Sequence, residues 1–167
     1  MSNLVYLMCS LPSLKFGEVP PITMDEFTHD AKDQLSAKHF KLLEPVDIYQ
    51  AADSDGKLGL KSIGTMLDEL QDDITEIRSA KTQNRAPNLT RLPHAVINAN
   101  PLEREKLIMQ WQWQELDTIQ AGEVFTFTEV MVYKLRLQIL SRLHSFNQEH
   151  GSQVLASVVN PSKEKEE

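Results

Sequence analysis

Residues 126–146 read T-F-T-E-V-M-V-Y-K-L-R-L-Q-I-L-S-R-L-H-S-F, and their pattern indicates a helical fold. Thr126 and Glu129 have the spacing of a capping box, which predicts the start of a helix over about 127–150. Apolar side chains occur on nearly every side of that helix. The polar exceptions are Lys134, Arg136, Gln138 and Arg142. A helix that is apolar on most sides is buried, either in a bundle or in a complex.

Three of these exceptions are cationic, and they allow two interpretations. Long basic side chains can bury their stems and extend the charged group to solvent. Alternatively, one of them pairs with an acidic group inside the bundle or on a partner protein. The second interpretation makes Lys134, Arg136 and Arg142 candidate partner-binding residues.

A second long helix is predicted over about 58–83, where apolar residues recur at steps of three and four. This heptad seam consists of Leu60, Ile63, Leu67, Leu70, Ile74 and Ile77. Such spacing is typical of an amphipathic helix or a short coiled coil. Between the seam residues lie acidic side chains that form either a solvated face or a surface for a partner. The candidate partner-binding residues here are Asp68, Asp72, Asp73 and Glu76.

A third long helix is predicted over about 101–121. Asn100 can cap it, Pro101 suits its first position, and Gly122 can end it. Trp111 and Trp113 point in directions roughly 200° apart around its axis. One indole is therefore expected in the core, while the other covers an edge or meets a partner, and Trp113 is the candidate.

Shorter elements complete an all-α, single-domain bundle of about five helices over residues 1–160. A capping box at Thr23 predicts a helix over 24–34, and Ser36 can cap another that must end before Pro45. Residues 4–11 are too short to distinguish strand from helix, although we expect them to be buried. Residues 84–99 form an internal loop or a mobile stretch. Gly151 can end the 127–150 helix, an apolar turn follows at 154–159, and residues 161–167 form a disordered charged tail.

Composition excludes several classes of function. The chain has 167 residues with a net charge of −7, which argues against nucleic-acid binding. Residues 1–77 carry a net −8 and residues 78–162 a net +2, so the acidic half could steer a basic partner. No apolar run is long enough to span a bilayer, and residues 1–15 lack the pattern of a signal peptide, so we expect a cytosolic protein.

No constellation for catalysis, metal or cofactor binding emerges from the sequence. The five histidines include no i, i+4 pair, and no phosphate-binding or nucleophile motif is present. Residues 51–62 begin like a calcium-binding loop, but Ala51 and Ser62 stand where the two end ligands are needed. Cys9 is either a nucleophile or a small buried hydrophobe, and its apolar neighbours favour the second. We therefore expect a protein that is not an enzyme and uses no cofactor.

Two parts of the chain carry a family resemblance. The first is Y-L-M-C-S-L-P-S-L-K-F-G over 6–17, followed by P-P-I-T over 20–23, E-F over 26–27 and Q-L-S over 34–36. The second is N-P-L-E over 100–103, F-T-E over 127–129 and Y-K-L-R-L-Q-I-L-S-R-L over 133–143. Together they resemble a bacterial family of uncharacterised proteins encoded among the subunits of V-type ATPases. The second part is also similar to the C-terminal helices of the shaft-seating subunit of V-type ATPases, a funnel of helical repeats that seats the central shaft on the membrane ring.

The resemblance implies a non-catalytic accessory or central-stalk component of a V-type rotary ATPase. Such a protein links or assembles the soluble head and shaft with the membrane rotor, and its partners are other ATPase subunits. It would lie in the cytoplasm, attached to the membrane only through the complex. The alternative, from the residues alone, is an unrelated interaction module that self-associates through the 60–77 seam.

Overall fold

The computed structural model describes residues 3–49 and 60–146, and within these ranges it contains seven helices and no strand. The helices are α1 (Leu4–Ser10), α2 (Met24–Gln34), α3 (Ala37–Leu43), α4 (Leu60–Thr82), α5 (Ala95–Asn98), α6 (Pro101–Gln120) and α7 (Phe127–Ser145). The all-α prediction is confirmed. The count of about five was too low because α1 and α5 have only seven and four residues, too few for a periodic pattern.

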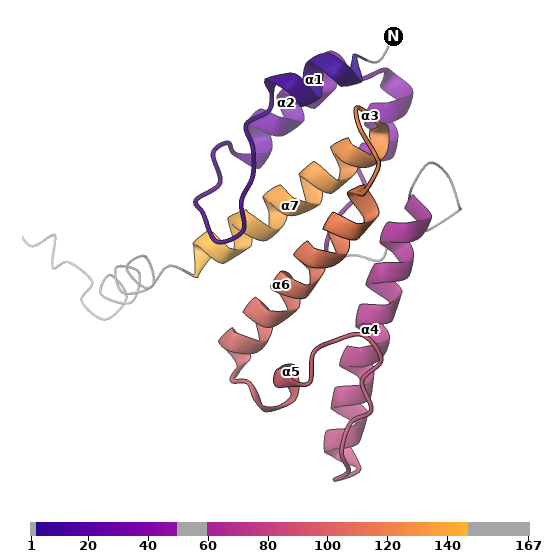
Figure 1. The fold of residues 1–167 in the computed structure, drawn as a ribbon, viewed down its shortest axis with the longest axis vertical. Coiled ribbons are helices and arrows are strands. Elements are labelled where there is room, and N and C mark those ends of the chain that lie inside the picture. The colour runs from indigo at the N-terminus through magenta and orange to yellow at the C-terminus, as the bar shows by residue number, and fades with distance from the viewer. Residues whose placement is uncertain (1–2, 50–59, 147–167) are drawn as a thin grey trace, which may run out of the picture.

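Helix α7 lies at the centre of the layers (Figure 1). It packs against α6 on one side and against α1 and α2 on the other, while α4 covers the far side of α6. Ten of its 19 residues are therefore buried. This position explains why its sequence is apolar nearly all round, since neighbouring helices cover most of its faces.

Side-chain caps begin five of the described helices: the four that the sequence predicts, and α1, where the Asn3 side chain accepts the Tyr6 N–H. Thr23 and Glu26 form the complete capping box of α2, and the Ser36 hydroxyl accepts from the His39 N–H at α3. Asn100 caps α6 by accepting from the Glu103 N–H. Thr126 caps α7 in the same way. These bonds satisfy helix-end N–H groups that have no partner within the helix.

A tight turn joins α6 and α7 into an antiparallel hairpin (Figure 1). Gly122 has φ +82°, so glycine is suited to end α6 there. Phe125 also has a positive φ, +54°, and its N–H donates to Glu129 Oε2 at 2.6 Å. In the predicted capping box, the Glu129 carboxylate would accept the N–H of Thr126. In the structure it accepts the N–H of Phe125, the residue before the cap.

Two predicted helix limits differ from the structure. The helix expected over 127–150 ends at Ser145, where the Phe146 N–H bonds to Leu143 O and tightens the last turn. The helix expected over 58–83 is described from Leu60 and ends at Thr82. The turn at 53–57, the Gly151 cap, the apolar turn at 154–159 and the tail at 161–167 lie outside the described residues.

The first element is a helix, and the prediction that it is buried was wrong. Only Leu7 of α1 is buried, whereas Val5 and Tyr6 are more than half exposed. Cys9 is also exposed, so it is not a buried hydrophobe. The reason is position: α1 covers α2 and α7 from outside, so only one of its faces meets the core.

Candidate interaction site

The eight candidate partner-binding residues lie on α4, α6 and α7, and most of them bond within the chain. They are Asp68, Asp72, Asp73, Glu76, Trp113, Lys134, Arg136 and Arg142. The structure therefore separates candidates that are committed to the fold from candidates that face outward.

Lys134 does not extend to solvent. Its side chain lies in the core with 9% of the residue exposed. The ammonium group donates to Leu43 O at 2.9 Å and to Glu44 O at 3.0 Å, at the end of α3. Burial lowers the pKa of the Lys134 ammonium, while Asp47 and Glu44 oppose that shift. A cation bound to the last carbonyls of a helix satisfies groups that the helix leaves unpaired.

Gln138 and Tyr133, which lie near Lys134 on α7, also form hydrogen bonds to the backbone of other segments. Gln138, one turn after Lys134, accepts the Ile48 N–H at 3.0 Å. The Tyr133 hydroxyl donates to Pro12 O at 2.8 Å, and burial raises the pKa of Tyr133 to about 12. Helix α7 thus supplies hydrogen-bond partners to two segments that form no helix of their own.

Arg136 and Trp113 contact each other at the α6–α7 interface. The Arg136 guanidinium lies 5.0 Å from the centre of the Trp113 ring, and it bonds to Gln120 and Asp117. Phe16 packs edge-on against the same indole at 5.5 Å. Trp113 therefore covers an edge of the bundle, whereas Trp111 is buried in the core.

Arg142 is paired at the protein surface. Its Nε donates to Glu105 Oε1 at 2.8 Å, which links α7 to α6, and its guanidinium lies 5.0 Å from the Phe146 ring. The bond to Glu105 is the main cause of the raised pKa of Arg142. Exposed pairs of this kind contribute little to stability.

Asp73 on α4 is a buried carboxylate bound to backbone. It is 2% exposed and accepts the N–H groups of Thr90, Arg91 and Leu92 at 2.9, 2.8 and 2.7 Å. Burial alone would raise the pKa of Asp73, but these three donors outweigh burial and lower it. The predicted loop at 84–99 is thereby fixed to α4, and it contains α5.

Glu76 binds the same loop one turn later. It pairs with the Arg85 guanidinium and accepts the Asn88 N–H at 3.0 Å. The bond to Arg85, helped by the Asn88 N–H, lowers the pKa of Glu76 to about 2. Arg91, which the sequence did not single out, then bridges Glu69 on α4 to Glu115 on α6.

Asp68 and Asp72 are the two candidates that face outward. Both are exposed, and within residues 3–49 and 60–146 neither forms an ion pair. The seam beneath them packs into the core of the same chain, since Ile63, Leu67 and Leu70 are buried. The outer face of α4 thus carries two exposed carboxylates, and neither forms an ion pair within the described residues.

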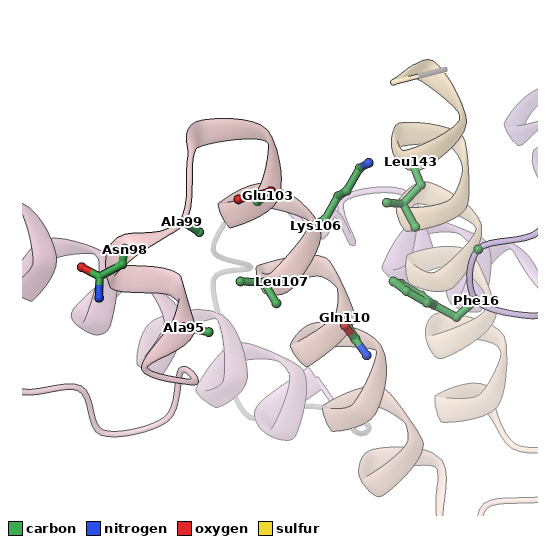
Figure 2. A pocket seen from close by; sticks show the side chains of 10 residues that line it. Phe16, Ala95, Asn98, Ala99, Glu103, Lys106, Leu107, Gln110 and Leu143 are labelled. Atoms are coloured by element: carbon green, nitrogen blue, oxygen red, sulfur yellow. The ribbon is translucent and has the colours of Figure 1, made fainter. Parts of the chain in front are cut away.

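A groove of about 750 Å³ opens on another side of the molecule (Figure 2). Phe16 and Leu143 form one side of it, and Ala95 and Ala99 from the α5 region form the other. Leu107 of α6 lies between them. The lining is mainly apolar, with Lys106, Glu103, Gln110 and Asn98 as its polar members.

The described residues offer no centre for metal chemistry. Over residues 3–49 and 60–146, no three His, Cys, Asp or Glu side chains lie close enough together to bind a metal ion. None of the helices in this part of the chain is long and apolar enough to cross a membrane.

The chain matches no known protein family, no curated protein and no solved structure.

Proposed function

We propose that the chain is a non-catalytic accessory or central-stalk component of a V-type rotary ATPase. It would link or assemble the soluble head and shaft with the membrane rotor, as its resemblance to the shaft-seating subunit implies. Its partners would be other subunits of that complex, and it would be attached to the membrane through them.

One observation carries this proposal: the two parts of the chain with the family resemblance meet in space. Tyr133, in the second part, bonds to Pro12 of the first and stacks on Phe27 at 5.5 Å between ring centres. Residues more than a hundred positions apart thus form one packed unit of α1, α2 and α7. A resemblance spread over both ends of a chain is more informative when its residues form a single structural unit.

The distribution of charge supports a surface on the outer face of α4. Asp68 and Asp72 are exposed there, while Asp73 and Glu76 are bound to the 85–92 loop. An exposed acidic face can orient a basic partner during encounter. We infer that Asp68 and Asp72 are the carboxylates that contact another component of the ATPase.

The experiment is affinity purification of the tagged full-length chain from cells that express the V-type complex. We expect ATPase subunits to co-purify, and deletion of the gene to abolish ATP-driven ion transport in membrane vesicles. Charge reversal at Asp68→Lys with Asp72→Lys should weaken the association. The matched control is reversal of the exposed acid on α2, Asp30→Lys, which should leave it unchanged. Full assembly and coupling in the deletion strain would refute the proposal.

Self-association through the 60–77 seam has less support, because its apolar residues already pack against the chain's own core. Light scattering of the purified chain separates the two functions. We expect a monomer at micromolar concentration. A tight dimer that dissociates when Leu67 and Leu70 are changed to Asp, in a chain that stays folded, would favour the alternative.

A further inference from the structure

A cleft of about 180 Å³ lies between α4 and α6, which pack side by side (Figure 1). It is separate from the larger groove beside α5, because the two share no lining residue. All residues that line this α4–α6 cleft belong to the ranges that the structure describes. The lining is mostly apolar, with Leu67, Leu70 and Ile74 from α4 and Ile108 and Met109 from α6.

Gln112 is a polar side chain within this apolar lining. It follows Ile108 by four positions and Met109 by three, so it belongs to the face of α6 that meets α4. Only 3% of the residue is exposed, yet its amide forms no hydrogen bond within residues 3–49 and 60–146. In the same ranges, the buried side-chain atom that is sealed from solvent without a partner is Arg136 Nε. The Gln112 amide is therefore not sealed, and the cleft that it lines gives it access.

The free amide of Gln112 indicates a bound polar group. A buried amide without a partner destabilises a fold, because it has lost its hydrogen bonds to water. Proteins therefore pair nearly all of their buried polar groups. A leucine would fill the same position without this cost. A molecule that enters the cleft can pair both the Nε2 donor and the Oε1 acceptor of Gln112.

The rim and the size of the cleft limit what it can bind. Glu105 is the charged residue of the lining, and its carboxylate already accepts from Arg142 Nε at 2.8 Å. The lining, all of it within the described ranges, offers no Lys, Arg or His to pair with an anion, which favours an uncharged ligand. An apolar cavity of roughly 150 Å³ can hold benzene. The α4–α6 cleft thus has room for one six-membered ring with a small substituent, and the half-exposed Tyr49 lies at its opening.

We propose that the α4–α6 cleft binds a small, uncharged ring compound that carries a carboxamide or a similar pair of donor and acceptor. The ring packs against Leu67, Leu70 and Ile108, and the carboxamide exchanges two hydrogen bonds with the Gln112 amide. This site does not depend on the proposed role in the ATPase, which concerns the outer face of α4.

The test is titration of the full-length, isotope-enriched chain with benzamide, followed through its backbone amide signals. We expect saturable shifts at residues 67–74 and 105–112 and none at residues 24–34 of α2. Acetophenone has the same size and carbonyl group but a methyl group in place of the amide nitrogen, so it should bind several-fold more weakly. Equal affinity for the two compounds would overturn the proposal. Shifts confined to residues 95–99 of the larger groove, or no saturable shift up to the solubility limit of benzamide, would overturn it too.

Matched variants test the role of Gln112. Gln112→Leu should lower the affinity for benzamide about tenfold, and it should raise the urea midpoint of the free chain because it removes an unpaired buried amide. Gln110→Leu, at an exposed position of α6 outside the cleft, should change neither value. Ile108→Trp fills the cleft but keeps Gln112, and it should abolish binding in a folded chain. Unchanged affinity in Gln112→Leu, or binding that survives Ile108→Trp, would overturn the proposal.

Discussion

Helices α4 and α7 both bury a charged side chain, but with opposite sign and for opposite backbone groups. Lys134 of α7 donates to carbonyls at the end of α3, whereas Asp73 of α4 accepts three N–H groups from the 90–92 loop. We call these two residues the anchors. In each helix, the sign of the buried charge matches the backbone groups that it binds in the adjacent segment, carbonyl groups for Lys134 and N–H groups for Asp73.

The helices differ in how many segments they fix. Because α7 has neighbours on both sides, Lys134, Gln138 and Tyr133 can reach segments around residues 43–48 and 12. The acidic residues of α4 that bond within the chain do so on one side, to residues 85–92, and its outer face keeps Asp68 and Asp72 exposed. A central helix thus uses its charges within the fold, while a peripheral helix retains some for solvent or a partner.

Removing the α4 anchor should have the largest effect. Asp73→Ala leaves three backbone N–H groups without their acceptor, one of them on the buried Leu92, and we expect it to destabilise the fold by about 3–4 kcal/mol in urea unfolding. The adjacent exposed residue gives the matched control, since Asp72→Ala should change stability by less than about 0.5 kcal/mol. Equal effects of the two substitutions would mean that Asp73 is not an anchor.

Removing the α7 anchor should cost less, because Leu43 O keeps its bond from the Val46 N–H and only Glu44 O loses its donor. Lys134→Met keeps the apolar stem but removes the bonds to Leu43 O and Glu44 O, and we expect a loss of about 2 kcal/mol. The exposed Lys41→Met on α3 removes the same charge and should be nearly neutral. A stabilising effect of Lys134→Met would show that desolvation of the ammonium outweighs its two bonds.

Much of the fold could be predicted from patterns of residues close together in the sequence. The bonds of the two anchors could not, because their partners are distant in the sequence. The caps at Thr23, Ser36 and Asn100 are confirmed because each depends on residues three positions apart. The partners of Lys134 lie about 90 residues away, and those of Asp73 lie 17–19 residues away across a loop. No periodic pattern in the sequence reveals such pairs, and the sequence favoured an extended, solvated side chain for Lys134.

For the same reason, the sequence alone could not show which candidate partner-binding residues are exposed. Asp68, Asp72, Asp73 and Glu76 follow one another on α4 and are indistinguishable as a run of acids. Only the returning 85–92 loop divides them into bound and exposed residues. Arg91 and Gln138 were missed for this reason, since their partners become neighbours only after the chain has folded.

A smaller loss of stability is expected at low pH. It involves the acidic residues of α4 and not Lys134 of α7. The pKa values of Asp73 and Glu76 are lowered in the folded chain from ordinary values of 3.8 and 4.5, that of Glu76 to about 2. Their contribution to stability is therefore complete above about pH 5 and is lost as the pH falls toward 2. Unfolding in urea at a series of pH values should show this decline.

Glu76→Gln removes one titrating group and should flatten the part of that decline between pH 4.5 and about 2. The Glu76 pair is exposed, so its share of the stability is small. Identical pH profiles for the variant and the wild-type chain would refute the assignment of Glu76 to the loop.

Hydrogen exchange at the amides of Thr90, Arg91 and Leu92 tests whether the Asp73 carboxylate fixes this loop to α4. These three N–H groups belong to no helix, and among the residues that the structure describes Asp73 is their acceptor. Under native conditions, we expect them to exchange as slowly as amides of the α4 core and to lose that protection in a folded Asp73→Asn chain. Exchange of the three amides at the rate of an exposed loop in the wild-type chain would mean that Asp73 does not anchor this loop to α4.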